Sequence, residues 1–411
     1  MSSSSQAARS GLIATTFVRP MLERLGRRFR VGTLTLTLPD GDTLTWCGRI
    51  DTGLAATWRL HDFGVLSALA SRGPIALGET YREGRWESDD LTRLLVVLAR
   101  NEPYLSVGLP QLSPARLVDR VLHRLRRNSK RQAQRNIHAH YDLGNAFYEA
   151  WLDDTMTYSA ARFDAGTAEE PLAEAQRRKY FRLAAATDLR AEHHVLEIGC
   201  GWGGFAEFAA REIGCRVTGI TISREQYDYA RARMARAGLA DRVDIQYVDY
   251  RDLAATAPRA FDRAISIEMF EAVGEEYWET YANTVLGLLA PGGRAGLQVI
   301  TVDDDRFDHY RARPDFIQRY VFPGGMLASP ERLTALFRAA GAEGGPVAAF
   351  GPDYARTLAA WERRFNAEWS RIRALGFDEP FRRFWTYYLS HCQAGFTLGW
   401  TDVQHFVFTR A

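Results

Sequence analysis

A cluster of glycines follows an apolar run and an acid near the middle of the 411-residue chain. Residues 195–204 read VLEIGCGWGG, and a helical pattern starts at Phe205. This order predicts a buried strand, a tight turn and the beginning of a helix. Glycines let a ligand approach the backbone, and free N–H groups at a helix N-terminus suit nucleotide-type cofactors. The turn is a candidate cofactor site, although Gly199, Gly201 and Gly204 also fit the spacing of dinucleotide-binding proteins.

The ends of the next two strands distinguish between the possible cofactors. A nicotinamide-binding domain carries an acid at the end of its second strand, where it binds the ribose hydroxyls. Here that strand ends in Thr221-Ile222-Ser223, and the first acid, Glu225, lies inside the following helix. The third strand ends at Asp249, whose carboxylate can accept a hydrogen bond from an adenine amino group. These positions argue against a nicotinamide-dependent oxidoreductase.

Strand and helix patterns alternate along the second half of the chain. Apolar runs predict strands at residues 195–198, 216–221, 243–248, 261–267 and 294–301, with helical stretches such as 223–236 and 275–289 between them. This alternation predicts an α/β fold with a doubly wound, mostly parallel sheet. Ligands of such sheets bind at the carboxyl ends of the strands, where the glycine turn lies.

Residues 1–115 are expected to form a small α+β accessory domain. Residues 33–47 predict a hairpin, short helices are expected at 61–72 and 90–100, and 78–86 is expected to be a link. Residues 116–135 form a basic helical stretch, which is either a solvated linker or a helix lying on anionic lipid. The catalytic domain would span 136–411.

The composition sets further limits on function. The chain is 46% hydrophobic and 25% charged, with a net charge of +2, so nucleic acid is not expected as a partner. Its four cysteines show no paired spacing, so we expect no metal site and a reducing cytoplasm. No apolar run approaches the length of a transmembrane helix, so any contact with a membrane is expected to be peripheral.

Several segments together resemble the cyclopropane-fatty-acyl-phospholipid synthase family. They are the glycine turn, HYDLGN at 140–145, MTYS at 156–159, TGITISREQ at 218–226, EMFEAVG at 268–274 and FIQRYVFPGG at 316–325. The resemblance covers the chain from about residue 136 to its end, and the N-terminal part looks like the accessory domain of longer bacterial members. It implies a class I methyltransferase fold with helical insertions and S-adenosylmethionine as the methyl donor.

The resemblance also implies which residues hold the cofactor. Gly199 and Gly201 would contact its amino-acid and ribose part, and Tyr158 and Ser159 would close over its methionine end. The full set of expected cofactor residues is Tyr158, Ser159, Glu197, Gly199, Gly201, Thr221, Ile222, Gln226 and Asp249.

The family's reaction, by resemblance, is methyl transfer to the double bond of a phospholipid acyl chain. Attack on the sulfonium methyl leaves a carbocation, and a base then removes a proton. Loss of a proton from the new methyl closes a cyclopropane ring, whereas loss from a neighbouring carbon gives a methyl-branched or methylene chain. The usual base is a bicarbonate ion, held by backbone N–H groups with a glutamate, a histidine and a tyrosine, beside a cysteine.

The expected catalytic positions match this pattern only in part. Glu271 and Tyr354 match, whereas the histidine position is Gln298 and the cysteine position is Ala160. The backbone N–H groups of Ala160 and Ile300 can still bind an anion, but Gln298 cannot carry a positive charge. Two outcomes stay open. Either bicarbonate binds and a cyclopropane forms, which is the conventional expectation, or Glu271 or Tyr354 acts without it and the chain is methylated but not cyclised.

The same resemblance implies phospholipid acyl chains as partners, with the protein cytoplasmic and peripheral on the inner face of the membrane. A homodimer is compatible with the sequence, which carries no direct signal of oligomeric state. Within the family, a diene fatty acid is an alternative substrate. A catalytically silent lipid-binding protein is a further alternative, against which Glu271, Tyr354 and the complete cofactor turn argue.

Overall fold

The computed structural model describes residues 18–105, 143–166, 170–256 and 259–411. The predicted basic helix at 116–135 and the start of the motif at 140–145 lie outside the described residues. The chain divides into two compact units. The described residues before 120 form the first unit together with 377–398, and the remaining described residues form the second.

A four-stranded sheet with the order β2-β1-β3-β4 forms the centre of the first unit. Its strands are β1 (Val31–Thr37), β2 (Thr43–Cys47), β3 (Ile50–Leu60) and β4 (Trp86–Glu87). The antiparallel pairing of β1 with β2 confirms the predicted hairpin. The helices of this unit are α2 (Arg19–Gly26), α3 (Gly64–Arg72), α4 (Ile75–Arg82), α5 (Leu91–Leu105) and α18 (Glu379–Thr397).

The prediction of a link at residues 78–86 is wrong for most of that stretch. Helix α4 continues to Arg82, and Gly78 is buried within it rather than marking a break. The Thr80 hydroxyl donates a hydrogen bond to the carbonyl oxygen of Ala76, which satisfies this polar group inside the helix. Burial of the helix against its neighbours therefore outweighs the low helix propensity of glycine.

Helix α18 comes from the far end of the sequence but packs against α4 and α5 of the first unit. The guanidinium of Arg383 donates hydrogen bonds to the carbonyl oxygens of Tyr81, at 2.5 Å, and Trp86, at 2.6 Å. The sequence-based range 136–411 placed this helix with the catalytic domain. Amphipathic periodicity indicates that a helix has a buried face but not which element covers it.

The second unit contains a seven-stranded sheet with the order β10-β11-β9-β8-β5-β6-β7. Its strands are β5 (His194–Ile198), β6 (Arg216–Thr221), β7 (Val243–Tyr247), β8 (Phe261–Ile267), β9 (Leu289–Val302), β10 (Ala342–Ala349) and β11 (Thr401–Arg410). The neighbouring strands β7, β6, β5, β8 and β9 are parallel to one another, and β11 is antiparallel to its neighbours β9 and β10. The five predicted strands and the mostly parallel, doubly wound α/β sheet are confirmed. Since β6 and β8 lie on opposite sides of β5, the crevice at the end of β5 is a switch point of the topology.

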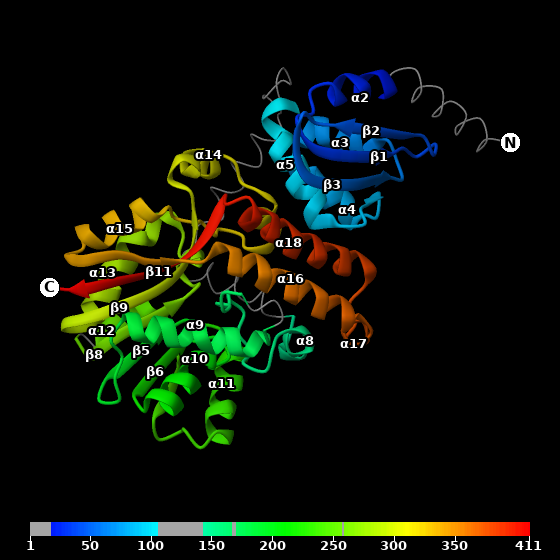
Figure 1. The fold of residues 1–411 in the computed structure, drawn as a ribbon. Helices are drawn as coiled ribbons and strands as arrows, with labels where there is room; N and C mark the ends of the chain where they lie inside the picture. Colours follow the sequence, from blue (N-terminus) through cyan, green and yellow to red (C-terminus); the bar gives the residue numbers. More distant parts are fainter. Residues whose placement is uncertain (1–17, 106–142, 167–169, 257–258) are drawn as a thin grey trace. The chain divides into compact units, whose positions relative to one another are not determined.

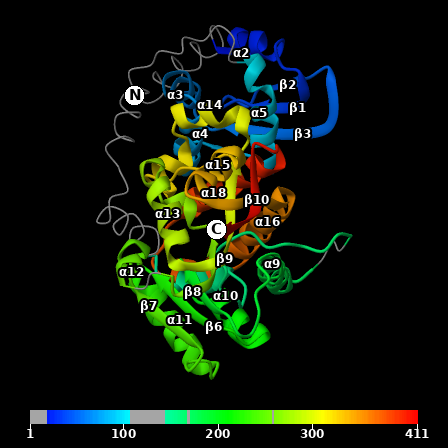
Figure 2. The same ribbon diagram turned by 90° about the vertical axis from the view of Figure 1, so that its left-hand side faces the viewer.

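Helices of the second unit cover both faces of this sheet (Figures 1 and 2). They are α8 (Asn145–Trp151), α9 (Leu172–Ala186), α10 (Gly204–Phe208), α11 (Arg224–Arg236), α12 (Tyr250–Thr256), α13 (Trp278–Leu288), α14 (Phe307–Ala312), α15 (Pro330–Ala339), α16 (Gly351–Ala367) and α17 (Trp369–Ala374). A π-helical turn, Ala209–Ile213, continues α10. Short 3-10 turns at Phe270–Ala272 and Glu275–Tyr277 follow β8.

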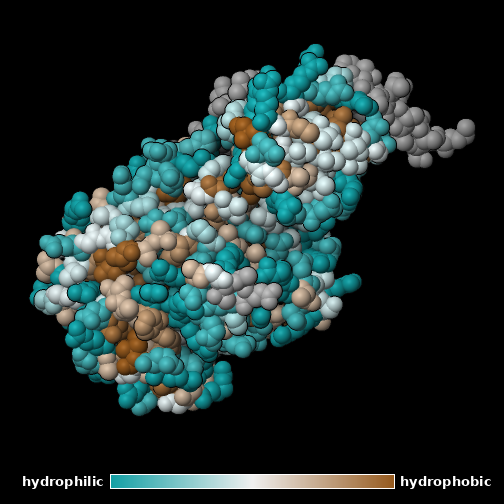
Figure 3. Space-filling model, in the orientation of Figure 1, coloured by the Kyte–Doolittle hydropathy of each residue, from teal (hydrophilic) through white to brown (hydrophobic). Residues whose placement is uncertain are grey.

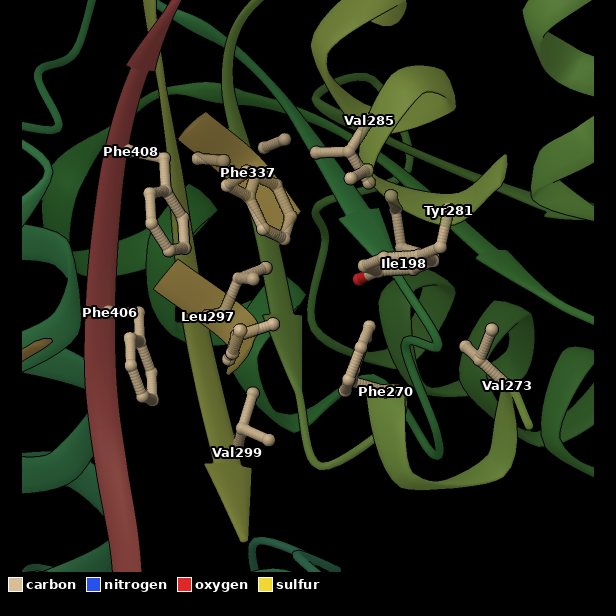
Figure 4. Close-up of a cluster of buried hydrophobic side chains, with 14 of the residues drawn as sticks. Ile198, Phe270, Val273, Tyr281, Val285, Leu297, Val299, Phe337, Phe406 and Phe408 are labelled. Carbon is tan, nitrogen blue, oxygen red and sulfur yellow. The ribbon is translucent and has the colours of Figure 1, made fainter. Parts of the chain in front are cut away.

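The larger hydrophobic core lies between the sheet and helices α12, α13 and α15 (Figure 4). Its members include Leu297 and Val299 from β9 and Phe408 from β11, and the ring of Phe337 stacks on Phe408 with centroids 4.2 Å apart. Each fully buried side chain of this size stabilises the fold by about 1.5–3 kcal/mol. This core fixes β8, β9 and β11, which carry the polar site described below.

Hydrophobic residues on the face seen in Figure 3 lie in separate patches among hydrophilic ones. Large exposed hydrophobic side chains in the described part of the chain include Phe181 of α9, at 60% exposure, and Val347 of β10, at 55%. Within the described ranges, none of the helices is both long enough and apolar enough to cross a bilayer.

Candidate active site

The glycine turn after β5 adopts a backbone that requires glycine. Gly199 has φ +80° and Gly201 has φ +53°, both in the left-handed region. The N–H groups of Gly199 and Cys200 donate to the carbonyl oxygen of Ile220, each at 3.0 Å, and tie the turn to β6. A Cβ at Gly199 would lie 2.9 Å from Cγ of Met269, whereas a Cβ at Gly201 would meet no described atom within 4 Å. The space beside Gly201 therefore leaves the backbone open to a ligand.

Glu197, on β5 just before the turn, has one carboxylate oxygen that receives no hydrogen bond from the described residues. The side chain is buried, and its Oε2 has no hydrogen-bond donor among the described residues. Removal from water raises the pKa of Glu197 well above its usual value, while Lys179, Arg233 and the N–H of Ala206 act in the opposite direction. A buried acceptor of this kind is costly unless a ligand hydroxyl or amino group satisfies it. Glu197 and Gly201 thus fit the polar end of the expected cofactor.

The tip of β6 is fixed by hydrogen bonds among its own residues. The Thr221 hydroxyl donates to Oε1 of Gln226 at 2.9 Å and accepts from the N–H of Ser223 at 3.1 Å. Ser223 caps α11 by accepting the N–H of Gln226 at 3.4 Å. Ile222 lies between these residues and is partly exposed. Three of the expected cofactor residues, Thr221, Ile222 and Gln226, are therefore gathered at one strand end.

Asp249 lies after β7 and is held by Arg251. The guanidinium of Arg251 donates to both carboxylate oxygens, at 2.8 Å and 2.6 Å, and the Arg251 N–H donates at 2.9 Å. Oδ1 of Asp249 accepts two of these three hydrogen bonds, and Oδ2 accepts one. The ion pair with Arg251 orients the Asp249 carboxylate.

A second polar cluster forms around Glu268, which follows β8 directly. Its Oε1 accepts hydrogen bonds from the N–H of Ala160, at 2.8 Å, and from Nε2 of Gln298, at 2.7 Å. Its Oε2 accepts from the hydroxyl of Tyr354 at 2.6 Å. Removal from water raises the pKa of Glu268, and these donors with Lys179 act against that rise. The structure therefore brings three expected catalytic residues together, but around a carboxylate that the sequence interpretation did not assign.

The orientation of Gln298 is set by His405 on the neighbouring strand β11. His405 pairs with Gln298 in the sheet register, and its Nε2 lies 3.0 Å from Oε1 of Gln298. Burial lowers the pKa of His405 to about 3, so this ring is neutral and donates through Nε2–H. Oε1 of Gln298 is thereby engaged, which leaves the Gln298 amide nitrogen to donate to Glu268 and, at 3.3 Å, to the carbonyl oxygen of Ala160.

Glu271 lies beside this cluster and pairs with Ile300, as expected. Its Oε1 accepts the N–H of Ile300 at 2.5 Å, and its Oε2 is inaccessible to solvent with no donor among the described residues. Removal from water, and then the negative charge of Glu268, raises the pKa of Glu271 to about 8. At neutral pH Glu271 is therefore mostly protonated.

Lys179 of α9 is a buried cation beside the same cluster. Its ammonium donates to Oγ of Ser159 at 2.7 Å and lies 4.6 Å from the ring centroid of Tyr180. Desolvation lowers the pKa of Lys179 to about 7, although Glu268, Asp153 and Glu197 act to raise it. Gln176, also on α9, donates from Nε2 to the carbonyl oxygen of Ser159 at 2.9 Å. Helix α9 thus fixes the segment that carries two expected cofactor residues.

Tyr158 is held by a group of aromatic rings. Its ring centroid lies 5.5 Å from those of Tyr148 and Trp151 and 5.3 Å from that of Trp361. These contacts join α8, α16 and the loop that carries Tyr158. The loop is therefore positioned from two sides, by aromatic packing at Tyr158 and by hydrogen bonds at Ser159.

The sequence interpretation missed Glu268, Lys179 and His405. Glu268 carried a signal, since it is the first acid after a central strand, at the end where ligands bind. Lys179 is one of only two lysines in the chain. His405 could not be identified from the sequence, because its role depends on the pairing of β11 with β9. Among the described residues, no group of three or more His, Cys, Asp and Glu side chains could hold a metal ion.

Known proteins share this fold and sequence pattern. The sequence model of the mycolic acid cyclopropane synthetase family matches residues 128–406. Tuberculostearic acid methyltransferase UfaA1 of Mycobacterium tuberculosis is 39% identical over 364 residues, which cover 84% of this chain and 81% of that protein. Cyclopropane-fatty-acyl-phospholipid synthase of Escherichia coli strain K12 is 35% identical over 370 residues, covering 88% and 90%.

A solved structure agrees with these sequence matches. The mycolic acid cyclopropane synthase CmaA1, complexed with SAH and CTAB, has a TM-score of 0.61 and 28% identity. The likeness covers 67% of this chain and 98% of that protein.

Proposed function

Because the chain belongs to the mycolic acid cyclopropane synthetase family and is an S-adenosylmethionine-dependent methyltransferase, we propose that it methylates an unsaturated fatty acyl chain. S-Adenosylmethionine supplies, when bound, a methyl group on a positively charged sulfonium. The names of the relatives given above refer to tuberculostearic acid and to a cyclopropane-fatty-acyl phospholipid. Such chains are held in membranes, so the enzyme would work as a peripheral protein at the cytoplasmic membrane surface.

One observation carries this proposal. Two acids, Glu268 and Glu271, follow β8, and β8 pairs with β5, whose end carries the glycine turn. A turn that would accept the cofactor thus lies next to two carboxyl groups, one of which can receive a proton. Methylation of an alkene requires both, since the cation left on the lipid is neutral only after a proton is lost.

Different residues around the turn would bind different parts of the cofactor. The unpartnered oxygen of Glu197 would accept a hydrogen bond from its polar end, and Gly201 would leave room for it beside the backbone. Tyr158 and Ser159, held by α8, α9 and α16, would exclude water from the methionine end. Asp249 would accept from the adenine amino group.

For the product, we favour a methyl-branched or methylene chain, with a cyclopropane as the second candidate. Gln298 is neutral and is held by the neutral His405, so this pair supplies no positive charge to retain a bicarbonate ion. The likeness to a cyclopropane-fatty-acyl-phospholipid synthase supports the ring.

Lipid mass spectrometry tests the proposal. Expression in a host with monounsaturated phospholipids should add one CH₂ unit to their acyl chains, and the variant Glu197→Gln should add less. Ozonolysis then separates a branched alkene, which is cleaved, from a ring, which resists. If dienoic but not monounsaturated chains gain CH₂, the substrate is a diene. A chain that binds S-adenosylhomocysteine but modifies neither would contradict the proposal and favour a silent lipid-binding protein.

A further inference from the structure

The carboxylate of Glu268 occupies the hydrogen-bond donors that the resemblance assigns to a bicarbonate ion. These donors are the N–H of Ala160 at the cysteine position, the side chain at the histidine position, Gln298, and the hydroxyl of Tyr354. They come from the loop after α8, from β9 and from α16, and all three converge on one side chain. A carboxylate and a bicarbonate ion present the same pair of charged oxygens to such donors.

The backbone at Glu268 indicates that this placement is specific. Glu268 has φ +51°, in the left-handed region that residues other than glycine seldom adopt. Its N–H nevertheless donates to the carbonyl oxygen of Gln298 at 2.8 Å, so the strained turn is held against β9. Backbone strain of this kind persists where the surrounding structure requires it, often at functional sites.

We propose that Glu268 replaces bicarbonate as the catalytic base, so that the enzyme turns over without that ion. This inference rests on the proposed function. A second anion on the same donors would meet a like charge and would find each of these N–H and O–H groups already engaged. Glu268 as a whole residue is only partly buried, at the end of β8 where ligands of such a sheet bind.

The neighbouring acid, Glu271, is less suited to the role. Glu268 receives three hydrogen bonds, and the ammonium of Lys179 further favours its charged form. Glu271 receives one, from Ile300, and the charge of Glu268 favours its protonated form. When the two carboxyls hold one proton, that proton resides on Glu271 and leaves Glu268 as the base.

The reaction balances with these groups alone. The π electrons of the alkene form a bond to the methyl carbon, and the carbon–sulfur bond breaks with its electron pair remaining on sulfur, which gives S-adenosylhomocysteine. The other alkene carbon becomes cationic. A neighbouring C–H bond then breaks, its electron pair forms the new C=C bond, and the proton goes to a carboxylate oxygen of Glu268. A 1,2-hydride shift before this step gives the methylene isomer.

The experiment measures CH₂ transfer by the full-length enzyme to vesicles of monounsaturated phospholipid, with and without bicarbonate in carbon-dioxide-free buffer. The wild type should keep its rate when bicarbonate is removed. Glu268→Ala should lose on the order of 100-fold or more, and added bicarbonate should restore part of the rate. Glu268→Gln should also be inactive, and bicarbonate should not restore it, because the amide fills the same space. The exposed acid Glu276, in the same segment, supplies the control Glu276→Gln, which should keep the wild-type rate.

Two results would overturn the inference: a wild-type rate that collapses without bicarbonate, or a Glu268→Gln variant as fast as the wild type. Calorimetric binding of S-adenosylhomocysteine shows whether each variant is folded. A wild type that transfers no CH₂ under any condition would contradict the proposed function itself, and is thereby distinguished from failure of the role of Glu268.

Discussion

Replacing Lys179 with methionine should stabilise the protein near neutral pH while lowering its activity. The side chain is fully buried, and desolvation lowers its pKa from 10.5 to about 7. That difference, at 1.36 kcal/mol for each pKa unit, corresponds to about 5 kcal/mol against folding at pH 7. The unfolded chain does not bear this cost, because water solvates its ammonium group.

One loss offsets part of the gain. The hydrogen bond to Ser159 disappears, which costs about 1.5–3 kcal/mol for a charged donor. The attraction of Glu268, Asp153 and Glu197 for the ammonium group is already contained in the lowered pKa of Lys179. A net stabilisation of about 2 kcal/mol remains, which raises the melting temperature by about 4–8 °C for a unit of this size. Turnover should fall, since Ser159 and Glu268 lose the group that orients one and favours the charge of the other.

The pH dependence of the stability difference between Lys179→Met and the wild type shows whether the lowered pKa of Lys179 is its cause. The folded pKa of Lys179 lies below the unfolded one, so the unfolded state binds more protons between about pH 7 and 10.5. Wild-type stability therefore rises with pH in this window, and the advantage of Lys179→Met shrinks. Thermal unfolding from pH 6 to pH 9.5 measures this, with Arg182→Met, at an exposed position of the same helix, as the control. A variant less stable than the wild type at pH 7, or an advantage independent of pH, would refute the reasoning.

Other predictions concern the two remaining acids and the glycine turn. Because the pKa of Glu271 is raised to about 8, turnover should fall above that pH, and Glu271→Gln should remove this alkaline limb from the pH–rate profile; a limb that survives would contradict the assignment. Glu197→Gln should weaken binding of S-adenosylhomocysteine about 10-fold to 100-fold by calorimetry, and an unchanged Kd would mean that the unpartnered oxygen does not bind the cofactor. Gly199→Ala should lower the free energy of unfolding by more than the about 1–2 kcal/mol expected for a left-handed backbone alone, because the new Cβ meets Met269; in denaturant unfolding, Gly238→Ala, which meets nothing, supplies the comparison.

The strands of the second unit could be predicted because their signal is local. The run at 195–198 is apolar and ends in glycines, and each later strand likewise ends at a polar turn. Buried parallel strands are read from such runs without knowledge of their neighbours. The position of α18 could not be predicted in this way, because its place in the first unit depends on α4 and α5, about 300 residues earlier in the chain.

The catalytic cluster could be predicted as a set of positions but not as a set of contacts. Ala160, Gln298 and Tyr354 were expected to gather around an anion, and in the structure they contact the carboxyl group of Glu268. Glu268 and Glu271 are three residues apart after the same strand, and their positions in the sequence do not show which of them will contact these donors. Their difference follows from the register of β9 against β8, which brings the side chain of Gln298 to Glu268 and the N–H of Ile300 to Glu271.

The replacement of the family's cysteine by Ala160 and of its histidine by Gln298 has a physical explanation if Glu268 takes the place of the bicarbonate ion. A diffusing ion must be captured from solution, and a cationic donor helps to retain it after binding. A carboxylate joined to the backbone is already in place, so neutral donors suffice, and the backbone N–H of Ala160 needs no thiol beside it. The neutral His405 then serves to orient Gln298 rather than to supply charge. Ala160, Gln298 and Glu268 are therefore best understood as one coupled change, in which a built-in base removes the need for a site that binds a free anion.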